Sequence, residues 1–283
     1  PSGLMISKRG HTRDHHQVTH YIAGRVKQHK IRTVDDIDTR ALTRIIREHG
    51  EVYGKITTNP KDVPTKCSVD KNIVEQVSVK SIEHFKTAKK FNYIEPNIVV
   101  MDFGYKHSIT KSFLDLGCNV TVVPFNTTFI EIAKMDPDGV VLSNGPGDPK
   151  HLHYLAPNIK QIAENYPTLG ICLGHQVVAL AFGAKTKRLP YGHRGSNHPV
   201  KDLTTGKVLI TSQNHGYVVD IDSINNDEWK VSHINVNDRS CEGLIHLNKN
   251  VMTVQFHPDA IDINNIYDQF ISKTAAKGEK QHA

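Results

Sequence analysis

Residues 168–176 read TLGICLGHQ, and this stretch decides the fold that we expect. Its apolar run predicts a buried strand, and the apolar residues that follow predict a packed helix. Cys172 lies at the junction, with Gly170 and Gly174 two residues to either side. This pattern is typical of a nucleophile elbow, a strained turn that presents a reactive side chain at the end of a strand. The free N–H groups of the next helix can stabilise a thiolate or an oxyanion. The alternative for a lone cysteine is an inert, buried side chain.

A nucleophilic cysteine needs a base, and the base needs an orienting group. Residues 251–259, VMTVQFHPD, supply both, because they predict a strand that ends at Pro258 with His257 and Asp259 at its exit. His257 can take the thiol proton and later protonate a leaving amine, while Asp259 fixes the tautomer of the ring. One histidine among 18 is a weak signal. A His-Pro-acid group downstream of a cysteine elbow is a much stronger one.

Strands and helices alternate through the middle of the chain, which predicts an α/β fold with a doubly wound, mostly parallel sheet. We expect strands at residues 97–103, 119–125, 139–143 and 168–172, and helices at residues 106–116, 128–134 and 151–166. Ligands of such sheets bind beyond the carboxyl ends of the strands, where Asn144 and Cys172 both fall. After residue 184 we expect a mixed or antiparallel extension of the sheet, with strands at residues 207–212, 216–220, 230–235, 241–247 and 251–256. A final helix is expected at residues 263–274.

The sequence predicts a domain at residues 96–274, preceded by a smaller domain and linker at residues 1–95 and followed by a charged tail at 275–283. In the smaller domain, Asp38 is the start signal of a helix at residues 39–47, and residues 51–57 predict a short strand. Four histidines near the start form a weak candidate metal site, at His11, His15, His16 and His20. A polar terminus is the favoured interpretation, so we predict no metal site.

Composition excludes several classes of protein. At 283 residues, 38% hydrophobic and 23% charged, the chain is typical of soluble globular proteins. No apolar run approaches the roughly 20 residues of a membrane span, and no signal peptide is visible. The net charge of +6 is spread along the chain, with its main clusters at the two ends and no interleaved aromatic residues, which argues against a nucleic-acid interface. The four cysteines have no paired or metal-ligand spacing, so we expect a reducing, cytoplasmic location.

Residues 170–176 (GICLGHQ) and 255–259 (QFHPD) together resemble the class I, or triad, glutamine amidotransferases. Other segments look like the small, glutaminase subunits of carbamoyl-phosphate synthetases, in collinear order from about residue 30 to residue 270. These segments are DTRALT at 38–43, LSNGPGDP at 142–149, GHRGSNHP at 192–199 and TSQNHGY at 211–217. The resemblance implies a flavodoxin-like amidotransferase domain.

The resemblance also implies an activity. Cys172, His257 and Asp259 would hydrolyse L-glutamine through a thioester, and the ammonia would pass to a large synthetase subunit that makes carbamoyl phosphate for arginine or pyrimidine biosynthesis. The amides of Gly145 and Leu173 would form the oxyanion hole, which their positions beside the elbow also favour. The family's glutamine contacts fall on Gly147, Gln176, Asn214, Gly216 and Tyr217.

A cofactor on this chain is not expected. The glycine loop at residues 144–149 lacks the Gly-x-Gly-x-x-Gly pattern and is not followed by a Walker lysine. The ATP and Mg²⁺ needed for carbamoyl phosphate synthesis are therefore expected on the large subunit, in a heteromer with this chain.

Three departures from the family leave alternatives open. Asp259 stands where the family has glutamate, which shortens the reach by about 1.5 Å. Residues 260–266, AIDINNI, lack the usual Ser-Pro-Gly-Pro-like turn. The family's longer N-terminal region has no match here, so we expect this domain to be either truncated or diverged past recognition. One alternative is another triad amidotransferase, of the anthranilate or GMP type. The second is a catalytically weakened subunit that binds and regulates a synthetase.

Overall fold

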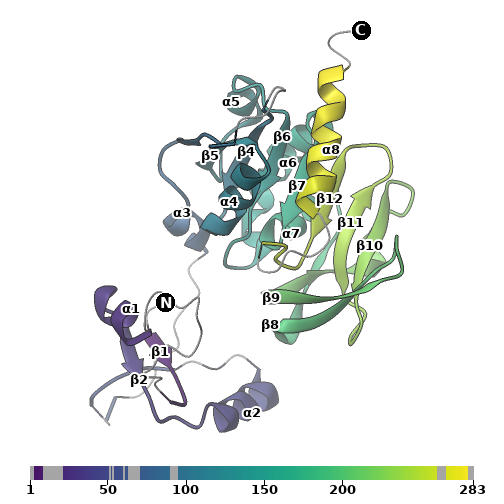
Figure 1. Ribbon diagram of the computed structural model, residues 1–283. Helices are drawn as coiled ribbons and strands as arrows, with labels where there is room; N and C mark the ends of the chain where they lie inside the picture. Colours follow the sequence, from purple (N-terminus) through teal and green to yellow (C-terminus); the bar gives the residue numbers. More distant parts are fainter. Residues whose placement is uncertain are drawn as a thin grey trace. The chain divides into compact units, whose positions relative to one another are not determined.

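The computed structural model describes residues 3–8, 22–50, 52, 54–59, 61–62, 71–89, 95–259 and 266–279 (Figure 1). The chain forms two compact units, Pro1–Ser68 and Val69–Ala283. The sequence predicts a small domain and linker at residues 1–95. The described residues 71–89 belong instead to the second unit, because β3 (Glu83–Phe85) pairs with a strand of its sheet.

The first unit contains a parallel strand pair and two helices. Its elements are β1 (Gly3–Met5), α1 (Ile22–Gln28), β2 (Arg32–Val34) and α2 (Thr39–His49). The helix start predicted at Asp38 is confirmed, because its carboxylate accepts a hydrogen bond from Ala41 N at 2.9 Å and so caps α2. The strand predicted for residues 51–57 is absent from the described residues 52 and 54–57. The four N-terminal histidines lie outside the described residues.

The second unit is built on one mixed sheet of ten strands, in the order β3-β5-β4-β6-β7-β12-β11-β10-β8-β9. Its strands after β3 are β4 (Asn97–Asp102), β5 (Asn119–Pro124), β6 (Gly139–Leu142), β7 (Thr168–Ile171), β8 (Thr186–Asp202), β9 (Val208–Val219), β10 (Trp229–Asn235), β11 (Cys241–His246) and β12 (Val251–Val254). The pairs from β5 to β12 are parallel, and those outside them are antiparallel. The expected parallel α/β core with an antiparallel extension is thus confirmed.

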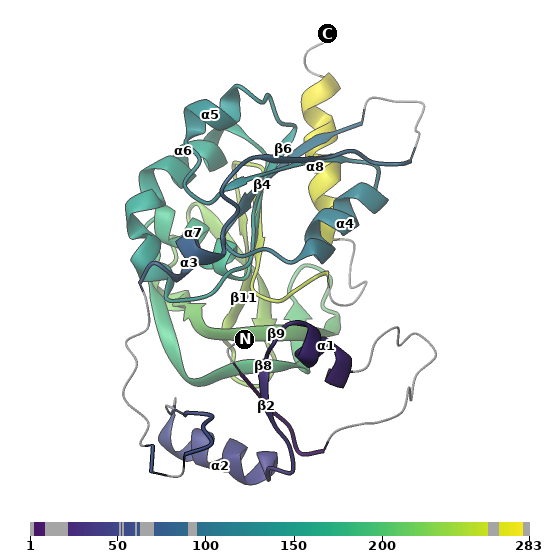
Figure 2. The ribbon, with the colours of Figure 1, turned by 90° about the vertical axis from the view of Figure 1, so that its left-hand side faces the viewer.

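Helices cover both faces of the parallel strands, as Figure 2 shows. One face carries α5 (Phe129–Ala133), α6 (Ala156–Asn165) and α7 (Leu173–Ala181), and the other carries α4 (His107–Asp115) and α8 (Ile266–Glu279). The short α3 (Ile73–Val77) precedes β3. The predicted helix at 151–166 is divided into a 3-10 segment, Pro149–Leu155, and α6, because Pro157 fits the first turn of a helix and not its interior. The helix α8 extends to Glu279, into the predicted tail.

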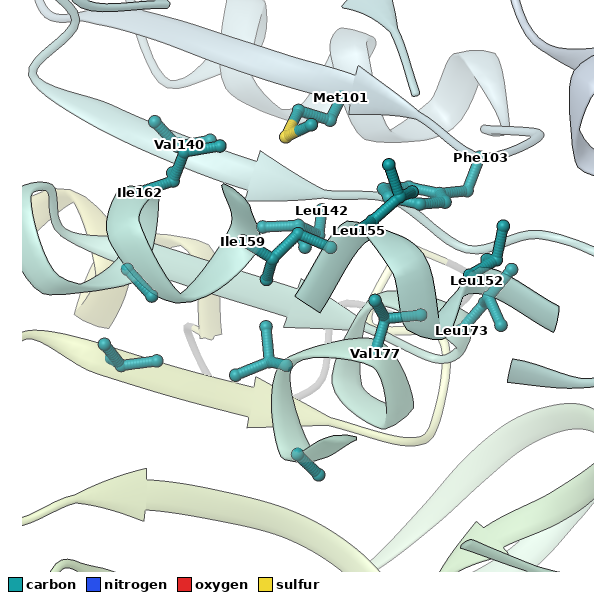
Figure 3. Close-up of a cluster of buried hydrophobic side chains, with 14 of the residues drawn as sticks. Met101, Phe103, Val140, Leu142, Leu152, Leu155, Ile159, Ile162, Leu173 and Val177 are labelled. Atoms are coloured by element: carbon teal, nitrogen blue, oxygen red, sulfur yellow. The ribbon is translucent and has the colours of Figure 1, made fainter. Parts of the chain in front are cut away.

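Apolar side chains hold the helices onto the sheet. Figure 3 shows Ile159 and Ile162 of α6, and Val177 of α7, in one buried cluster with Val140 and Leu142 of β6. Each fully buried aliphatic side chain contributes about 1.5–3 kcal/mol. This packing fixes the N-terminus of α7 at the carboxyl ends of β6 and β7, where ligands of such sheets bind.

The long β8–β9 hairpin was only partly predicted. Residues 186–202 gave no strand signal, although β8 covers all of them. Its register against β9 shifts between Arg188 and His193 and again between Gly195 and His198. Gly192 and Gly195 have φ values of 68° and 143° at these irregularities, which break the alternation that identifies a strand in a sequence.

No helix among the described residues is long and apolar enough to cross a membrane.

The aromatic contact under α8 should carry a large share of the stability of the second unit. Phe270 is fully buried, lies 6.0 Å from the ring of Phe113, and occupies the space over Gly139. We expect Phe270→Ala to lower the free energy of unfolding by about 3–5 kcal/mol in urea titrations, because it leaves a cavity. Ile130→Ala, at a side chain that is 66% exposed, is the matched control and should change it by less than about 0.5 kcal/mol. Equal losses of unfolding free energy in the two variants would contradict the conclusion that Phe270 is a core residue.

Candidate active site

Cys172 is the N-cap of α7 and follows β7 directly, as a nucleophile elbow requires. Its φ and ψ of 55° and −102° are unusual for a residue with a side chain, and such strain costs about 1–3 kcal/mol. Its N–H donates to Val254 O at 2.8 Å, which helps to hold the turn. The flanking glycines are required sterically. A Cβ at Gly174 would lie 2.1 Å from Leu142 O, and one at Gly170 would lie 2.9 Å from the backbone of Gly174.

The two predicted oxyanion-hole residues lie next to each other. An added Cβ at Gly145 would be 2.8 Å from the Leu173 side chain and 2.1 Å from Phe103 O, so only glycine fits there. Within the part of the chain that the structure describes, neither the Gly145 nor the Leu173 N–H donates to a protein acceptor. Leu173 is the first residue of α7, so its N–H cannot be used inside the helix. Both amides can therefore serve a substrate oxygen.

His257 and Asp259 follow β12, beside Cys172. The N–H of His257 donates to Ser212 O at 3.0 Å, which ties the segment to β9. His257 Nδ1 and Asp259 Oδ1 are 3.7 Å apart, an ion-pair distance that is too long for a direct hydrogen bond. Neither atom has a hydrogen-bond partner among the described residues. The other carboxylate oxygen accepts from Ser108 Oγ at 2.6 Å and lies 3.7 Å from Lys106 Nζ, both from the start of α4.

The electrostatics favour a charged pair. Burial lowers the pKa of His257, but the Asp259 carboxylate and direct interaction with the Cys172 side chain outweigh burial and raise this pKa to about 9. Burial raises the pKa of Asp259, but His257, Ser108 and Lys106 outweigh it and lower the pKa to about 2. The positive charge of His257 therefore lies beside the side chain of Cys172.

Two other cysteines provide a contrast. Burial raises the pKa of both Cys118 and Cys241 to about 12. Their thiols therefore stay protonated at neutral pH, as is typical of inert, buried cysteines. His175, three residues after the nucleophile, is fully buried, and its Nδ1 lies 2.8 Å from Thr253 Oγ1. Its position also fits packing.

The sequence interpretation missed Gln255. Its Nε2 donates to Cys172 Sγ at 3.6 Å, and its Oε1 accepts from Gln176 Nε2 at 2.9 Å. Gln176 Nε2 also donates to Tyr217 O at 2.7 Å. Because a carbonyl can only accept, this bond fixes the orientation of both amides and directs the Gln255 N–H toward the sulfur. A signal was available, since Gln255 lies two residues before His257 within the QFHPD motif.

The remaining predicted glutamine contacts lie on β9 and on the loop after β6. Asn214, Gly216 and Tyr217 are close together on β9, and Asn214 is exposed. Gly147, with φ of 97°, lies after β6, and a Cβ there would come within 3.0 Å of Ile73 of α3. The structure thus links Gln176 to Tyr217 and Gly145 to Leu173, while the glutamine contacts themselves stay predictions. Residues 260–265, which lack the family's turn, lie outside the described residues.

Comparisons with known proteins agree with this geometry. The family model for "Glutamine amidotransferase class-I" matches residues 99–268, and that for "Carbamoyl-phosphate synthase small chain, CPSase domain" matches residues 1–56. The chain belongs to the class I glutamine amidotransferase family.

Similar sequences show to which group within this family the chain belongs. Over 290 residues the chain is 42% identical to the carbamoyl phosphate synthase arginine-specific small chain of Halalkalibacterium halodurans, covering 100% of this chain and 79% of that one. It is 46% identical over 245 residues to the carbamoyl phosphate synthase small chain of Fusobacterium nucleatum, covering 83% and 67%. It is 42% identical over 274 residues to the arginine-specific small chain of Bacillus subtilis, covering 95% and 75%. Within its class, the chain is therefore a member of the carbamoyl phosphate synthase small chains.

One solved structure shows the same fold. It is that of a GMP synthase subunit from Thermoplasma acidophilum, with a TM-score of 0.59 and 24% identity over 68% of this chain and 100% of that chain. The match of residues 1–56 to the CPSase domain also corrects one expectation. The stretch before residue 30, for which we expected no counterpart, is part of the matched region.

The His257–Asp259 pair should make stability depend on pH. Because the folded pKa of His257 is raised from 6.5 to about 9, its contribution is complete below pH 6.5 and is lost as the pH rises through about 9. We expect the free energy of unfolding in urea to fall over this range. In Asp259→Asn the fall should be smaller, because the carboxylate that raises the pKa is gone. The same fall in both proteins would show that Asp259 is not the partner that matters.

The Gln255 contact should increase the reactivity of the nucleophile. Gln255→Met keeps the size of the side chain but removes the N–H that faces Cys172 Sγ. Hydrogen bonds to charged groups are worth about 1.5–3 kcal/mol, so we expect iodoacetamide to alkylate Cys172 about tenfold more slowly at neutral pH. Thr253→Val is the control, since this buried residue of β12 contacts His175 instead. Unchanged alkylation in Gln255→Met would refute the assignment.

Proposed function

We propose that the chain hydrolyses L-glutamine to glutamate and ammonia at Cys172 and passes the ammonia to a large synthetase subunit, which makes carbamoyl phosphate. The observation that carries this proposal is the position of Cys172, on a strained elbow in contact with His257. Family membership supports the same activity. The 3.7 Å distance between His257 Nδ1 and Asp259 Oδ1 bears on the rate of this reaction, because Asp259 orients the base.

In the first half-reaction, the Cys172 thiolate attacks the side-chain amide carbon of glutamine. The N–H groups of Gly145 and Leu173 stabilise the oxyanion that forms. The His257 imidazolium gives its proton to the amide nitrogen, the C–N bond breaks, and ammonia leaves. A γ-glutamyl thioester on Cys172 and a neutral His257 remain.

In the second half-reaction, His257 takes a proton from water, and the resulting hydroxide adds to the thioester carbonyl. The C–S bond then breaks, which releases glutamate and restores the thiolate beside an imidazolium. Asp259 holds a positive charge on His257 at both stages. Ser108 and Lys106 keep that carboxylate ionised and in place.

Substrate recognition is proposed for Gly147, Gln176, Asn214, Gly216 and Tyr217. Both N–H bonds of the Gln176 amide are already directed, to Tyr217 O and to Gln255 Oε1. Its carbonyl oxygen is therefore the atom suited to accept from the α-ammonium group of glutamine. Tyr217 contributes its backbone, so tyrosine in place of the family's usual phenylalanine is a mild change.

The cofactors and the partner are proposed together. Activation of bicarbonate by ATP and Mg²⁺ would take place on the large subunit, because the glycine loop of this chain has no nucleotide-binding motif. The arginine-specific names of two relatives favour the arginine branch. A reducing, cytoplasmic location agrees with the free Cys118, Cys172 and Cys241.

A second candidate function is a regulatory small subunit with weakened catalysis. The observation that favours it is the 3.7 Å separation of His257 Nδ1 and Asp259 Oδ1, where a glutamate would reach about 1.5 Å further. A poorly oriented base can cost orders of magnitude in rate.

Glutamate release from glutamine distinguishes the two candidates. We expect release by the purified chain to increase when its large subunit is added and to vanish in Cys172→Ala, while Cys118→Ala retains it. Release that stays at the Cys172→Ala level, with the large subunit demonstrably bound, would refute the proposed hydrolysis and support the regulatory role.

A further inference from the structure

Behind the strand that carries Asn214 to Tyr217, three potential metal ligands converge from different strands. His193 of β8, His215 of β9 and Glu242 of β11 place their ligand atoms within 4.8 Å of one another. Glu242 is fully buried, His215 is 7% exposed, and the His193 side chain is 12% exposed. We propose that this cluster is a binding site for a divalent transition metal with nitrogen and oxygen ligands, such as Zn²⁺.

The tautomers of both histidines direct lone pairs into the cluster. His215 Nδ1 lies 2.9 Å from Tyr217 O, which can only accept, so Nδ1 carries the proton and Nε2 has the lone pair. His193 Nε2 lies 2.8 Å from Asp238 Oδ2, and a carboxylate likewise accepts. His193 Nδ1 then faces Glu242 Oε1 at 3.4 Å, and it can act as a ligand when it carries no proton. Metal-binding histidines almost always donate their second N–H to a carboxylate or backbone carbonyl in this manner.

The side-chain oxygen of Gln213 is a fourth potential ligand of the same ion. Thr211 Oγ1 donates to His198 O at 2.9 Å, so it can only accept from Gln213 Nε2 at 3.1 Å. This fixes the Gln213 amide with its oxygen 2.5 Å from His215 Nε2 and 3.3 Å from His193 Nδ1. Two lone pairs that face each other so closely repel, and a cation bound to both atoms would relieve this repulsion as the two side chains move apart.

Glu242 also needs a positive partner. Its Oε1 accepts from Asn235 Nδ2 at 3.1 Å, but its Oε2 has no hydrogen-bond partner among the described residues. A buried carboxylate oxygen that lacks a hydrogen-bond partner is costly. A proton on His193 Nδ1 would satisfy one contact and would leave the His215 lone pair opposed by Gln213. One divalent ion would satisfy all four donors.

The chemistry and the access fit such an ion. Two imidazole nitrogens, a carboxylate and an amide oxygen suit Zn²⁺ and similar metals, and Glu242 with Asp238 balances a charge of two. A cavity of about 320 Å³, lined in part by His193 and Asp238, gives a route from solvent. Zn–N and Zn–O bonds of about 2.0–2.2 Å require Gln213 Oε1 and His215 Nε2 to move apart and the more distant ligand atoms to move closer.

The ion would stiffen the strand that we propose to bind glutamine, a consequence that rests on the proposed function. Tyr217 O accepts from His215 Nδ1 on one side and from Gln176 Nε2 on the other. It therefore joins the cluster to α7 and to the nucleophile. Loss of the metal should raise the KM for glutamine more than it lowers kcat.

The test uses the full, untagged chain, stripped with EDTA and titrated with Zn²⁺ by calorimetry and with Co²⁺ by visible absorption. We expect one equivalent, with d–d bands that report nitrogen and oxygen ligands. Glu242→Gln and His193→Asn should abolish binding at this site. Asp238→Asn changes a half-exposed side chain whose Oδ2 contacts His193 and whose Oδ1 accepts from Ser240. The amide keeps an oxygen for Ser240, so this variant should weaken metal binding about 10–100-fold without endangering the fold.

Two controls isolate the site. The double variant His16→Ala/His20→Ala removes N-terminal histidines, and Cys172→Ala removes the reactive thiol; both should keep the one equivalent. Because Cys172→Ala cannot hydrolyse glutamine, binding by it separates this proposal from the proposed function. The proposal is overturned if the chain binds neither ion, or if Glu242→Gln and Asp238→Asn, shown to be folded by circular dichroism, bind them as tightly as the unchanged protein.

Discussion

The backbone at Cys172 is the constraint on which the site depends. A residue with a side chain is held at positive φ because a strand ends and a helix begins within one residue. The strain is sustained by a hydrogen bond to Val254 of β12 and by two glycines where no Cβ fits. The apolar packing of α7 and α6 against β6 supplies the energy that holds this geometry. Strain concentrated at one residue, with stability provided elsewhere, is common at functional sites.

Around that point, the site is assembled by parallel strands that end together. Strands β6, β7 and β12 deliver the Gly145 loop, the cysteine and the histidine to one edge of the sheet. Helix α4 comes from the other face and contributes Ser108 and Lys106 to the carboxylate of Asp259. Asp259, the acid of the proposed triad, is thus held through Oδ2, the oxygen that does not face His257. This arrangement keeps a short aspartate ionised and fixed, while the gap to His257 remains at ion-pair length.

The antiparallel half of the sheet supports the site from the side of β9. It brings β9 beside α7, so that Tyr217 O accepts from Gln176, and it encloses a group of histidines and carboxylates behind the same strand. The shared carbonyl couples the two groups mechanically. Tyr217 of β9 and the Cys172 thiol are consequently two ends of one hydrogen-bond network, which runs through Gln176 and Gln255.

The sequence by itself determined the class of fold and the elbow, and it named the residues of the proposed triad and oxyanion hole, because these features are local. Each depends on a strand, a turn and a few glycines that are adjacent in the chain, and such patterns are visible as periodicity and motif. Irregular elements were less accessible: β8 contains glycine bulges that erase its alternation, and β3 was assigned to the wrong unit because a three-residue strand has no periodicity to read.

Only the tertiary structure decided which distant side chains meet. Ser108 and Asp259 are 151 residues apart, Gln255 and Cys172 are 83 apart, and the ligand cluster draws on three strands without any recognisable spacing. Hydrogen-bond direction, burial and the separation of His257 from Asp259 likewise arise from the packing of the sheet. They depend on distances of a few ångströms between segments that the order of residues leaves unspecified.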